Sequence, residues 1–361
     1  MVKIKYNGAK IAGIVTVVPE HKRRIDDEVH LYGNDPKQIA RIKNVIGLNE
    51  RYVSDVDTTT ADLCQEAAII LLKGLNVNIQ DIDGMILVTQ TPDYYSQPFT
   101  AACLHAKLGL SKDCLAYDVN LGCSGFVYGQ WLAHMMVSSG TCKNVLLLVG
   151  DTTSKICHPR DRAVAPLFGD AGTATLIQRS QQENPTFFTL HTDGTGFHNI
   201  IVPAGGCRMP RSSETSIEVE YDDGNVRTKE HLYMNGGEVF NFTMRELPPA
   251  MKEIFEFSGK TIEQIDYVVF HQANKYIITN IARRLNLPMD KAPAETTGRY
   301  GNLSSASIPA TICDVLSNEV SSSSKELVLA GFGVGFSWAT CAVKLDSIFC
   351  PEVQLYKGND K

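Results

Sequence analysis

The chain has 361 residues, of which 43% are hydrophobic and 20% are charged, with a formal net charge of −6. This length favours two domains or one large duplicated one, and the composition excludes wholesale disorder and fibrous architectures. Without any Lys/Arg block we expect no nucleic-acid partner, and the apolar runs are too short to span a bilayer.

Alternating helical and strand-like segments predict an α/β protein. Apolar residues at helical spacing predict a first helix over Thr60–Leu75. The first half then continues with strands at 84–89 and 115–119, an apolar helix at 126–137, a buried strand at 144–150, and a turn and small-residue strand at 169–177.

The second half repeats this order. The pentad IQDID ends at Asp83 before one strand, and IEQID ends at Asp266 before a strand at Tyr267–Phe270. Nearly equal distances along the chain separate Asp83 from Gly150 and Asp266 from Gly331, each at the end of a third strand. The pattern predicts an internal duplication, and chance similarity between α/β segments is the alternative.

We predict an N-terminal half at residues 1–180 and a C-terminal half at 181–361, joined near the polar stretch 178–185. A loop-rich excursion at 192–228 belongs to the second half. Because chemistry in α/β sheets collects at the carboxyl ends of strands, equivalent points of the two halves should meet in one cleft.

The segment DVNLGCSGF (118–126) runs from a strand through a glycine-rich turn into the apolar helix. We interpret Cys123 as the first residue of that helix, where the macrodipole and free N–H groups lower the pKa of a thiol and make it a nucleophile. Small neighbours allow a tight turn and close substrate approach. A packing cysteine is the alternative.

Two further segments end in polar residues. His271 follows three apolar strand residues in VVFHQAN (268–274), and Asn302 follows a glycine in GRYGNLSSA (298–306), where we expect it to open a helix. Singly, they are typical of a satisfied core histidine and a helix cap. Together with Cys123, at three strand or helix ends of a duplicated sheet, they indicate a catalytic site.

The glycines of AGFGVGF (330–336) do not have dinucleotide-binding spacing, and a strand at 337–343 follows. We expect this loop to bring its backbone to the reacting carbonyl, so that one of its N–H groups and that of Cys123 form an oxyanion hole. The chain has no G-x-S-x-G elbow and no P-loop.

The ten cysteines stand singly, without a C-x-x-C pair or zinc-ligand spacing. The N-terminal segment has no apolar signal region. We therefore expect reduced thiols, no metal site and a cytoplasmic protein.

The motifs NLGCSGF, FGDAGTA, HQAN, YGNLSSASIP and GFGVGF resemble the signatures of β-ketoacyl-acyl carrier protein synthase III, in the thiolase superfamily. The resemblance implies a duplicated five-layer αβαβα sandwich and a homodimer. It also implies decarboxylative Claisen condensation of an acyl-coenzyme A, or acyl-carrier protein, with malonyl-carrier protein in fatty-acid or specialised lipid or polyketide biosynthesis. Coenzyme A enters as a substrate, and no cofactor is implied.

By the same resemblance, Cys123 takes up the acyl group as a thioester, and His271 and Asn302 hydrogen-bond the malonyl thioester oxygen. The N–H groups of Cys123 and Val334 form the oxyanion hole. Arg162 matches a coenzyme-binding arginine.

The remaining expected substrate-binding residues are Asn274, Phe240, Gly236 and Arg41. Arg41 stands where the family has an adenine-gripping tryptophan, and Val45 stands where it has an arginine. Tyr276 replaces a basic residue that helps dock the carrier protein, and Pro98 replaces a phenylalanine of the acyl pocket. These departures favour a specialised pathway enzyme.

Three alternatives remain. The same fold could transfer an acyl group to a hydroxyl or amine without decarboxylation. A non-catalytic partner subunit would usually lack the cysteine. Thiolase or hydroxymethylglutaryl synthase chemistry is also possible, but a thiolase would need a second catalytic cysteine near the glycine loop, and Cys341 lies too far along the following strand.

Overall fold

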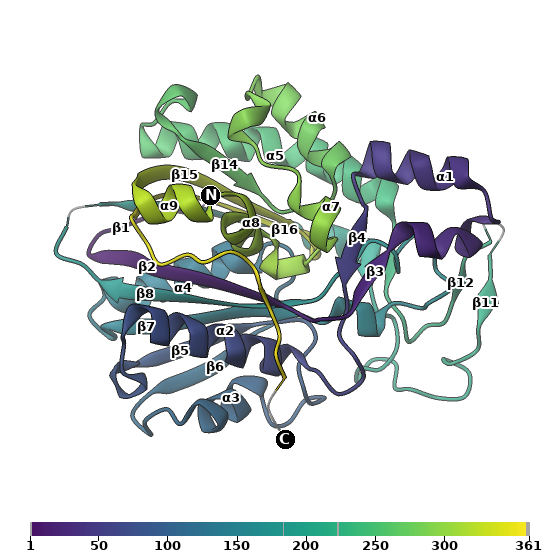
Figure 1. The fold of residues 1–361 in the computed structure, drawn as a ribbon, viewed down its shortest axis with the longest axis horizontal. Coiled ribbons are helices and arrows are strands. Elements are labelled where there is room, and N and C mark those ends of the chain that lie inside the picture. Colours follow the sequence, from purple (N-terminus) through teal and green to yellow (C-terminus); the bar gives the residue numbers. More distant parts are fainter. Residues whose placement is uncertain (1, 183, 222–223, 359–361) are drawn as a thin grey trace.

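Two mixed β-sheets form the framework of the computed structural model, which describes residues 2–182, 184–221 and 224–358 (Figure 1). The first sheet holds, in spatial order, β1 (Val2–Tyr6), β9 (Thr186–Thr192), β16 (Ser337–Asp346), β15 (Ser324–Gly333) and β14 (Tyr267–Phe270). The second holds β17 (Gln354–Leu355), β2 (Ala9–Val18), β8 (Ala171–Arg179), β7 (Asn144–Asp151), β5 (Gly84–Val88) and β6 (Leu115–Val119).

The described residues also form short strand pairs, nine α-helices and several short 3₁₀ or π segments. The short strands are β3 (Lys22–Arg24), β4 (Glu50–Tyr52), β10 (Ile200–Ile201), β11 (Val219–Glu220), β12 (Val226–Arg227) and β13 (Tyr233–Met234). The helices are α1 (Pro36–Arg41), α2 (Thr60–Leu75), α3 (Thr100–Leu108), α4 (Gly125–Ser138), α5 (Gly236–Ser258), α6 (Lys275–Leu285), α7 (Thr296–Tyr300), α8 (Ser307–Val315) and α9 (Ser317–Ser322).

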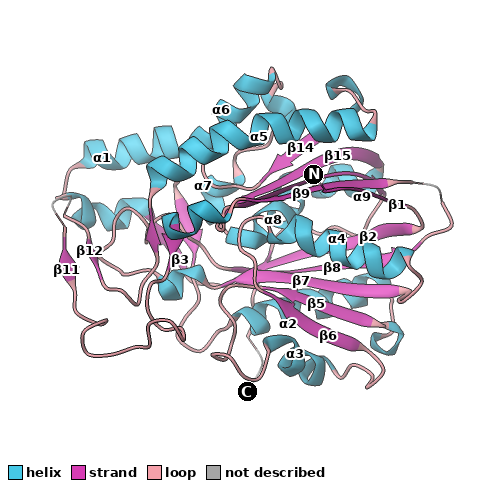
Figure 2. Cartoon of the chain, turned by 180° about the vertical axis from the view of Figure 1, so that it is seen from behind, coloured by secondary structure: helices cyan, strands magenta, loops and turns pink. Residues whose placement is uncertain are grey.

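The helices and sheets alternate in five layers (Figure 2). Helices α5 and α6 cover the outer face of the first sheet, α4 and α8 lie between the two sheets, and α2 and α3 cover the outer face of the second. The αβαβα sandwich predicted from the sequence is therefore confirmed.

The sequence determines local boundaries through specific caps. Helix α2 has the predicted bounds because Thr59 and Asp62 form a capping box, in which each side chain accepts a hydrogen bond from the other residue's backbone N–H. The helix ends at Asn76, which adopts the left-handed conformation with φ 52°. Its apolar side packs on the second sheet.

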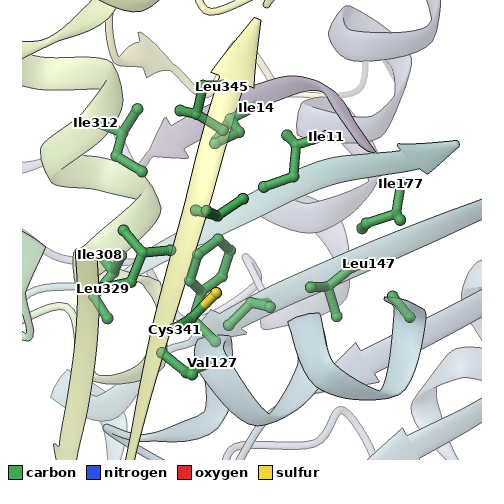
Figure 3. Packing of buried hydrophobic residues seen from close by; sticks show 14 of the residues in the cluster. Ile11, Ile14, Val127, Leu147, Ile177, Ile308, Ile312, Leu329, Cys341 and Leu345 are labelled. Atoms are coloured by element: carbon green, nitrogen blue, oxygen red, sulfur yellow. The ribbon is translucent and has the colours of Figure 1, made fainter. Parts of the chain in front are cut away.

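The largest apolar cluster lies between the two sheets (Figure 3). Val127 of α4, Ile308 of α8 and Leu329 of β15 meet there with Leu147 of the opposite sheet. Cys341 also belongs to this cluster, and burial raises the pKa of its thiol well above the ordinary value. A packing position of this kind does not supply the second reactive thiol that thiolase chemistry would need.

The two repeated aspartates make the same contacts in both halves. The backbone N–H of Asp83 donates to the carbonyl of Asn144, the first residue of β7, and the Asp83 carboxylate accepts the N–H of Asn144, both at 3.0 Å. Asp266 accepts the N–H of Glu326, at the start of β15, at 2.7 Å. Each therefore joins the beginning of one strand to the beginning of its parallel neighbour.

The strands β1 and β17 each join the sheet that is built mainly from the opposite half of the sequence. Strand β1 pairs with β9 in the first sheet, and β17 pairs with β2 in the second.

The division at residue 180 stays a prediction. Residue 183, in the expected join, and residues 222–223, in the loop-rich excursion, lie outside the described residues. Within the described parts of the chain, none of the helices combines the length and apolarity needed to cross a membrane.

Replacing Leu147 by alanine should lower the free energy of unfolding by about 2–5 kcal/mol, because this side chain is fully buried between the sheets. Denaturant unfolding would measure the change. Ile69→Ala is the matched control, since Ile69 is 51% exposed and its truncation should cost about 0.5 kcal/mol or less. Equal losses for the two variants would contradict the assigned core.

Candidate active site

Cys123 lies in the turn between β6 and α4, two residues before the helix begins, so the expectation that it starts the helix is wrong. The turn packs against the glycine loop that follows β15. A Cβ on Gly333 would lie 2.7 Å from Cβ and 2.8 Å from Sγ of Cys123. A Cβ on Gly122 would lie 2.6 Å from a methyl carbon of Val334. Glycine at these two positions therefore leaves the space that the side chains of Cys123 and Val334 occupy.

Asn302 is held in place by the segment that contains the FGDAGTA motif. Its backbone N–H donates to the carbonyl of Leu167 at 2.8 Å, and its carbonyl accepts from Gly169 at 3.2 Å. Gly301 adopts φ 75°, and a Cβ on Gly169 would lie 2.0 Å from the carbonyl oxygen of Tyr300. The glycines of two distant motifs thus permit one backbone-to-backbone contact. Asn302 does not open α8, which begins five residues later.

The Asn302 side chain has a defined orientation. Its Oδ1 accepts the backbone N–H of Ser304 at 2.9 Å. The amide nitrogen Nδ2 therefore lies on the opposite side of the carboxamide group. Its two N–H donors point away from the backbone of Ser304.

His271 follows the last residue of β14. Its backbone N–H donates to the carbonyl of Ala330 in β15, and Nδ1 of its ring lies 2.7 Å from Oγ of Ser307. Burial lowers the pKa of His271 to about 3, against a smaller opposing effect of the Ser304 carbonyl. The imidazole is accordingly neutral at physiological pH.

One cavity of about 110 Å³ brings most of the expected site residues together. The residues of the sequence-based prediction that line it are Cys123, His271, Asn302, Val334, Asn274 and Gly236. A largely apolar wall completes it, from Ile156, Leu167, Phe168, Ile200, Leu232, Met234, Val239 and Ile277. Asn274 also caps α6, where its Oδ1 accepts the N–H of Ile277 at 2.8 Å.

Three expected substrate-binding residues do not line this cavity. The Phe240 ring stacks on Tyr276, with centroids 5.5 Å apart. Arg41 is exposed at the end of α1, and the carbonyl of Arg162 accepts the hydroxyl of Tyr32 at 3.1 Å. Their role in coenzyme binding stays a prediction.

The sequence reasoning missed Asp151 and Ser304, which also line the cavity. Asp151 ends β7 and accepts the backbone N–H of Gln90 at 2.7 Å and the hydroxyl of Ser305 at 2.8 Å. Burial raises the pKa of its carboxyl. The strand-end rule that selected His271 applies equally to Asp151 and could have found it.

The thiol of Cys123 is in a desolvated environment. Burial raises its pKa to about 11, although the backbone N–H groups of Val334 and Cys123 and the side chain of Ser304 act in the opposite direction. The expectation that the helix start lowers this pKa is therefore wrong in net direction, because desolvation of the thiolate outweighs the nearby donors. Among the described residues, no group of three or more His, Cys, Asp or Glu side chains could hold a metal ion.

The architecture and the composition of the site define the thiolase-like class of condensing enzymes. Family models described as 3-oxoacyl-[acyl-carrier-protein] synthase III match residues 117–195 and, for the C-terminal part, 255–345. A Campylobacter jejuni protein provisionally named 3-oxoacyl-[acyl-carrier-protein] synthase 3 is 38% identical and aligns over 98% of this chain and 99% of its own.

A β-ketoacyl-[acyl-carrier-protein] synthase III from Xylella fastidiosa is 33% identical over 93% of this chain and 98% of its own length. The crystal structure of a 3-oxoacyl-(acyl-carrier protein) synthase from Burkholderia xenovorans superposes with a TM-score of 0.91, at 37% identity over 98% of this chain and 99% of that one. The chain belongs to the 3-oxoacyl-[acyl-carrier-protein] synthase III family.

Alkylation of Cys123 by iodoacetamide should accelerate about tenfold per pH unit between pH 7 and pH 9, because the thiolate is the nucleophile and the pKa of its thiol is about 11. Mass spectrometry of the Cys123 peptide would give the rate at each pH. Cys207, an exposed thiol, provides an internal comparison in the same digest. A rate for Cys123 that levels off below pH 8 would show that the thiol is already ionised near neutrality.

Proposed function

We propose that the protein is an acyltransferase that condenses an acyl thioester with malonyl-acyl carrier protein. The acyl donor is an acyl-coenzyme A or an acyl-carrier protein, and the acyl group passes through a thioester on Cys123. The observation that carries the proposal is the shared cavity of Cys123, His271 and Asn302, in which two backbone N–H groups act on the sulfur.

In the first half-reaction the sulfur of Cys123 attacks the donor's carbonyl carbon. The donor thiol leaves with the proton that the Cys123 thiol loses. The oxyanion that forms between these events needs preorganised donors, and the N–H groups of Cys123 and Val334 fit this role because they already act on the sulfur. Splitting the reaction through a thioester replaces one difficult step by two easier ones.

In the second half-reaction the malonyl carboxylate leaves as carbon dioxide, and its electron pair forms an enolate. The enolate carbon attacks the acyl thioester and expels Cys123 as a thiolate, which takes a proton from solvent to regenerate the thiol. His271 and Asn302 stabilise the negative enolate oxygen by hydrogen bonds. The contact between Oδ1 of Asn302 and the N–H of Ser304 supports this role, since it leaves the amide donors for substrate.

The apolar wall of the cavity supports a thioester substrate with a hydrocarbon portion. Ile200 comes from the loop-rich excursion at 192–228, Leu232 follows it closely, and Phe168 comes from the first half. Apolar side chains recognise such a chain by removing it from water, with about 25 cal/mol gained for each Å² that is buried. Fatty-acid, lipid or polyketide biosynthesis is the setting that we propose, in the cytoplasm.

Incubation with an accepted acyl-coenzyme A should add one acyl group to the protein, and Cys123→Ala should abolish the addition. Intact-protein mass spectrometry, over a panel of acyl donors, measures both. Cys207→Ala is the matched control, because it removes an exposed thiol outside the cavity and should acylate normally. Full acylation of the Cys123→Ala protein would refute the assignment of the nucleophile.

The same assay separates condensation from plain acyl transfer. Release of carbon dioxide and a β-ketoacyl product should require malonyl-carrier protein. If the acyl group instead moves to a hydroxyl or amine without the extender, the alternative without decarboxylation is correct.

We also propose a homodimer that forms at the β6 edge of the second sheet. Among the residues that the structure describes, strand β6 pairs with β5 on one side and with no strand on the other. Leu115 in β6 and Met135 in α4 are 36% and 37% exposed. An unpaired strand edge with apolar neighbours is a surface that natural proteins normally cover.

Light scattering after size-exclusion chromatography should therefore give twice the chain mass of 39.7 kDa. Replacing Met135 by lysine should shift the population toward the monomer, because the charge would have to be buried at the contact. Lysine at Ile69, an exposed position of α2 on the outer layer, is the control. A wild-type protein that elutes with the mass of one chain would contradict the dimer.

A further inference from the structure

A buried serine adjoins His271 on the side of Nδ1. Ser307 is the first residue of α8 and is 1% exposed. Its Oγ lies 2.7 Å from Nδ1 of His271 and accepts the backbone N–H of Gln272 at 3.2 Å. The hydroxyl therefore contacts both the ring of His271 and the backbone N–H of the next residue, Gln272.

The direction of the bond between Ser307 and His271 follows from the donors and acceptors present. A hydroxyl has one proton to donate, and the N–H of Gln272 already occupies part of its accepting capacity. Among the described residues, Nδ1 of His271 is the acceptor within hydrogen-bond distance of this hydroxyl. A hydroxyl that donates to Nδ1 leaves the single proton of a neutral imidazole on Nε2.

The other ring nitrogen of His271 reaches the cavity. Within the described part of the chain, Nε2 makes no hydrogen bond that meets normal geometry, yet it is not among the fully enclosed polar atoms without a partner. Nε2 of His134, in contrast, is enclosed in the core without a partner. A proton on Nε2 of His271 is thus available to a bound substrate.

We propose that Ser307 is a positioning residue that selects the tautomer of His271. Its hydroxyl donates to Nδ1 and so keeps the proton on Nε2, where the ring can donate to the enolate oxygen. This inference rests on the proposed condensation, because only a step with a developing oxyanion needs His271 as a donor.

Loss of the Ser307 hydroxyl shows why such a device is needed. This hydroxyl is the donor that the described residues place against Nδ1. Without it, a neutral imidazole is free to carry its proton on either nitrogen. A ring protonated on Nδ1 would present the lone pair of Nε2 to the enolate oxygen and repel it.

Ser307→Ala should separate the two half-reactions. Acylation of Cys123 should stay within about twofold of the wild-type rate, while decarboxylation of malonyl-carrier protein should fall about 10²-fold, the usual loss for one oxyanion donor. Ser307→Thr, which keeps the hydroxyl, should recover most of the decarboxylation rate. Ser317→Ala is the matched control, because it removes another buried serine hydroxyl at a helix start and does not line the cavity.

The protonated nitrogen can be observed directly. In protein labelled with ¹⁵N-histidine, the His271 signals, identified by their loss in His271→Gln, should show a proton on Nε2 in the wild type and a shift toward Nδ1 in Ser307→Ala. A wild-type proton on Nδ1, or a Ser307→Ala protein that decarboxylates at the wild-type rate, would overturn the proposal.

The two proposals fail in different ways. A wild-type protein that acylates but never decarboxylates malonyl-carrier protein would refute the condensation, while the ¹⁵N spectrum would still decide the tautomer. If Ser307→Ala does not fold, as judged by lost acylation of Cys123, the wild-type spectrum alone tests the direction of the bond.

Discussion

Close contact between backbones, made possible by missing side chains, is the constraint on which the whole site depends. A Cβ on Gly331 would lie 2.9 Å from Cα of Ser124 and 3.1 Å from the carbonyl oxygen of Cys123, and one on Gly169 would lie 2.0 Å from the carbonyl oxygen of Tyr300. Each contact joins a segment of the first half to a segment of the second. Cys123 and Asn302 are consequently held in place by main-chain contacts that a side chain at either glycine would prevent.

Desolvation then determines the charge state of the resting site. It raises the pKa of the Cys123 thiol and lowers that of the His271 imidazole, so both groups are neutral before substrate binds. The backbone N–H groups of Cys123 and Val334, which act on the sulfur, therefore face no resting negative charge. A neutral site of this kind avoids the large desolvation cost of holding ions in an apolar cavity.

The fold was largely predictable, because hydrophobic periodicity marks α2, β5, β6, α4, β7 and β14, and the repeated pentads mark the duplication. Strand ends and motif resemblance brought Cys123, His271 and Asn302 together as candidates. The charge state of Cys123 was not predictable, since burial depends on residues far along the chain. Asp151 was missed although it ends β7 and so satisfies the strand-end rule. Ser307 was missed because no local pattern distinguishes a buried serine from an ordinary helix start.

The crossing of β1 and β17 has a consequence for how the two halves fold. Strand β1 pairs with β9 of the later half, and β17 pairs with β2 of the earlier half. Each sheet is therefore complete only after a strand from the other half has joined it. The two halves consequently fold as one cooperative unit and not as two independent domains.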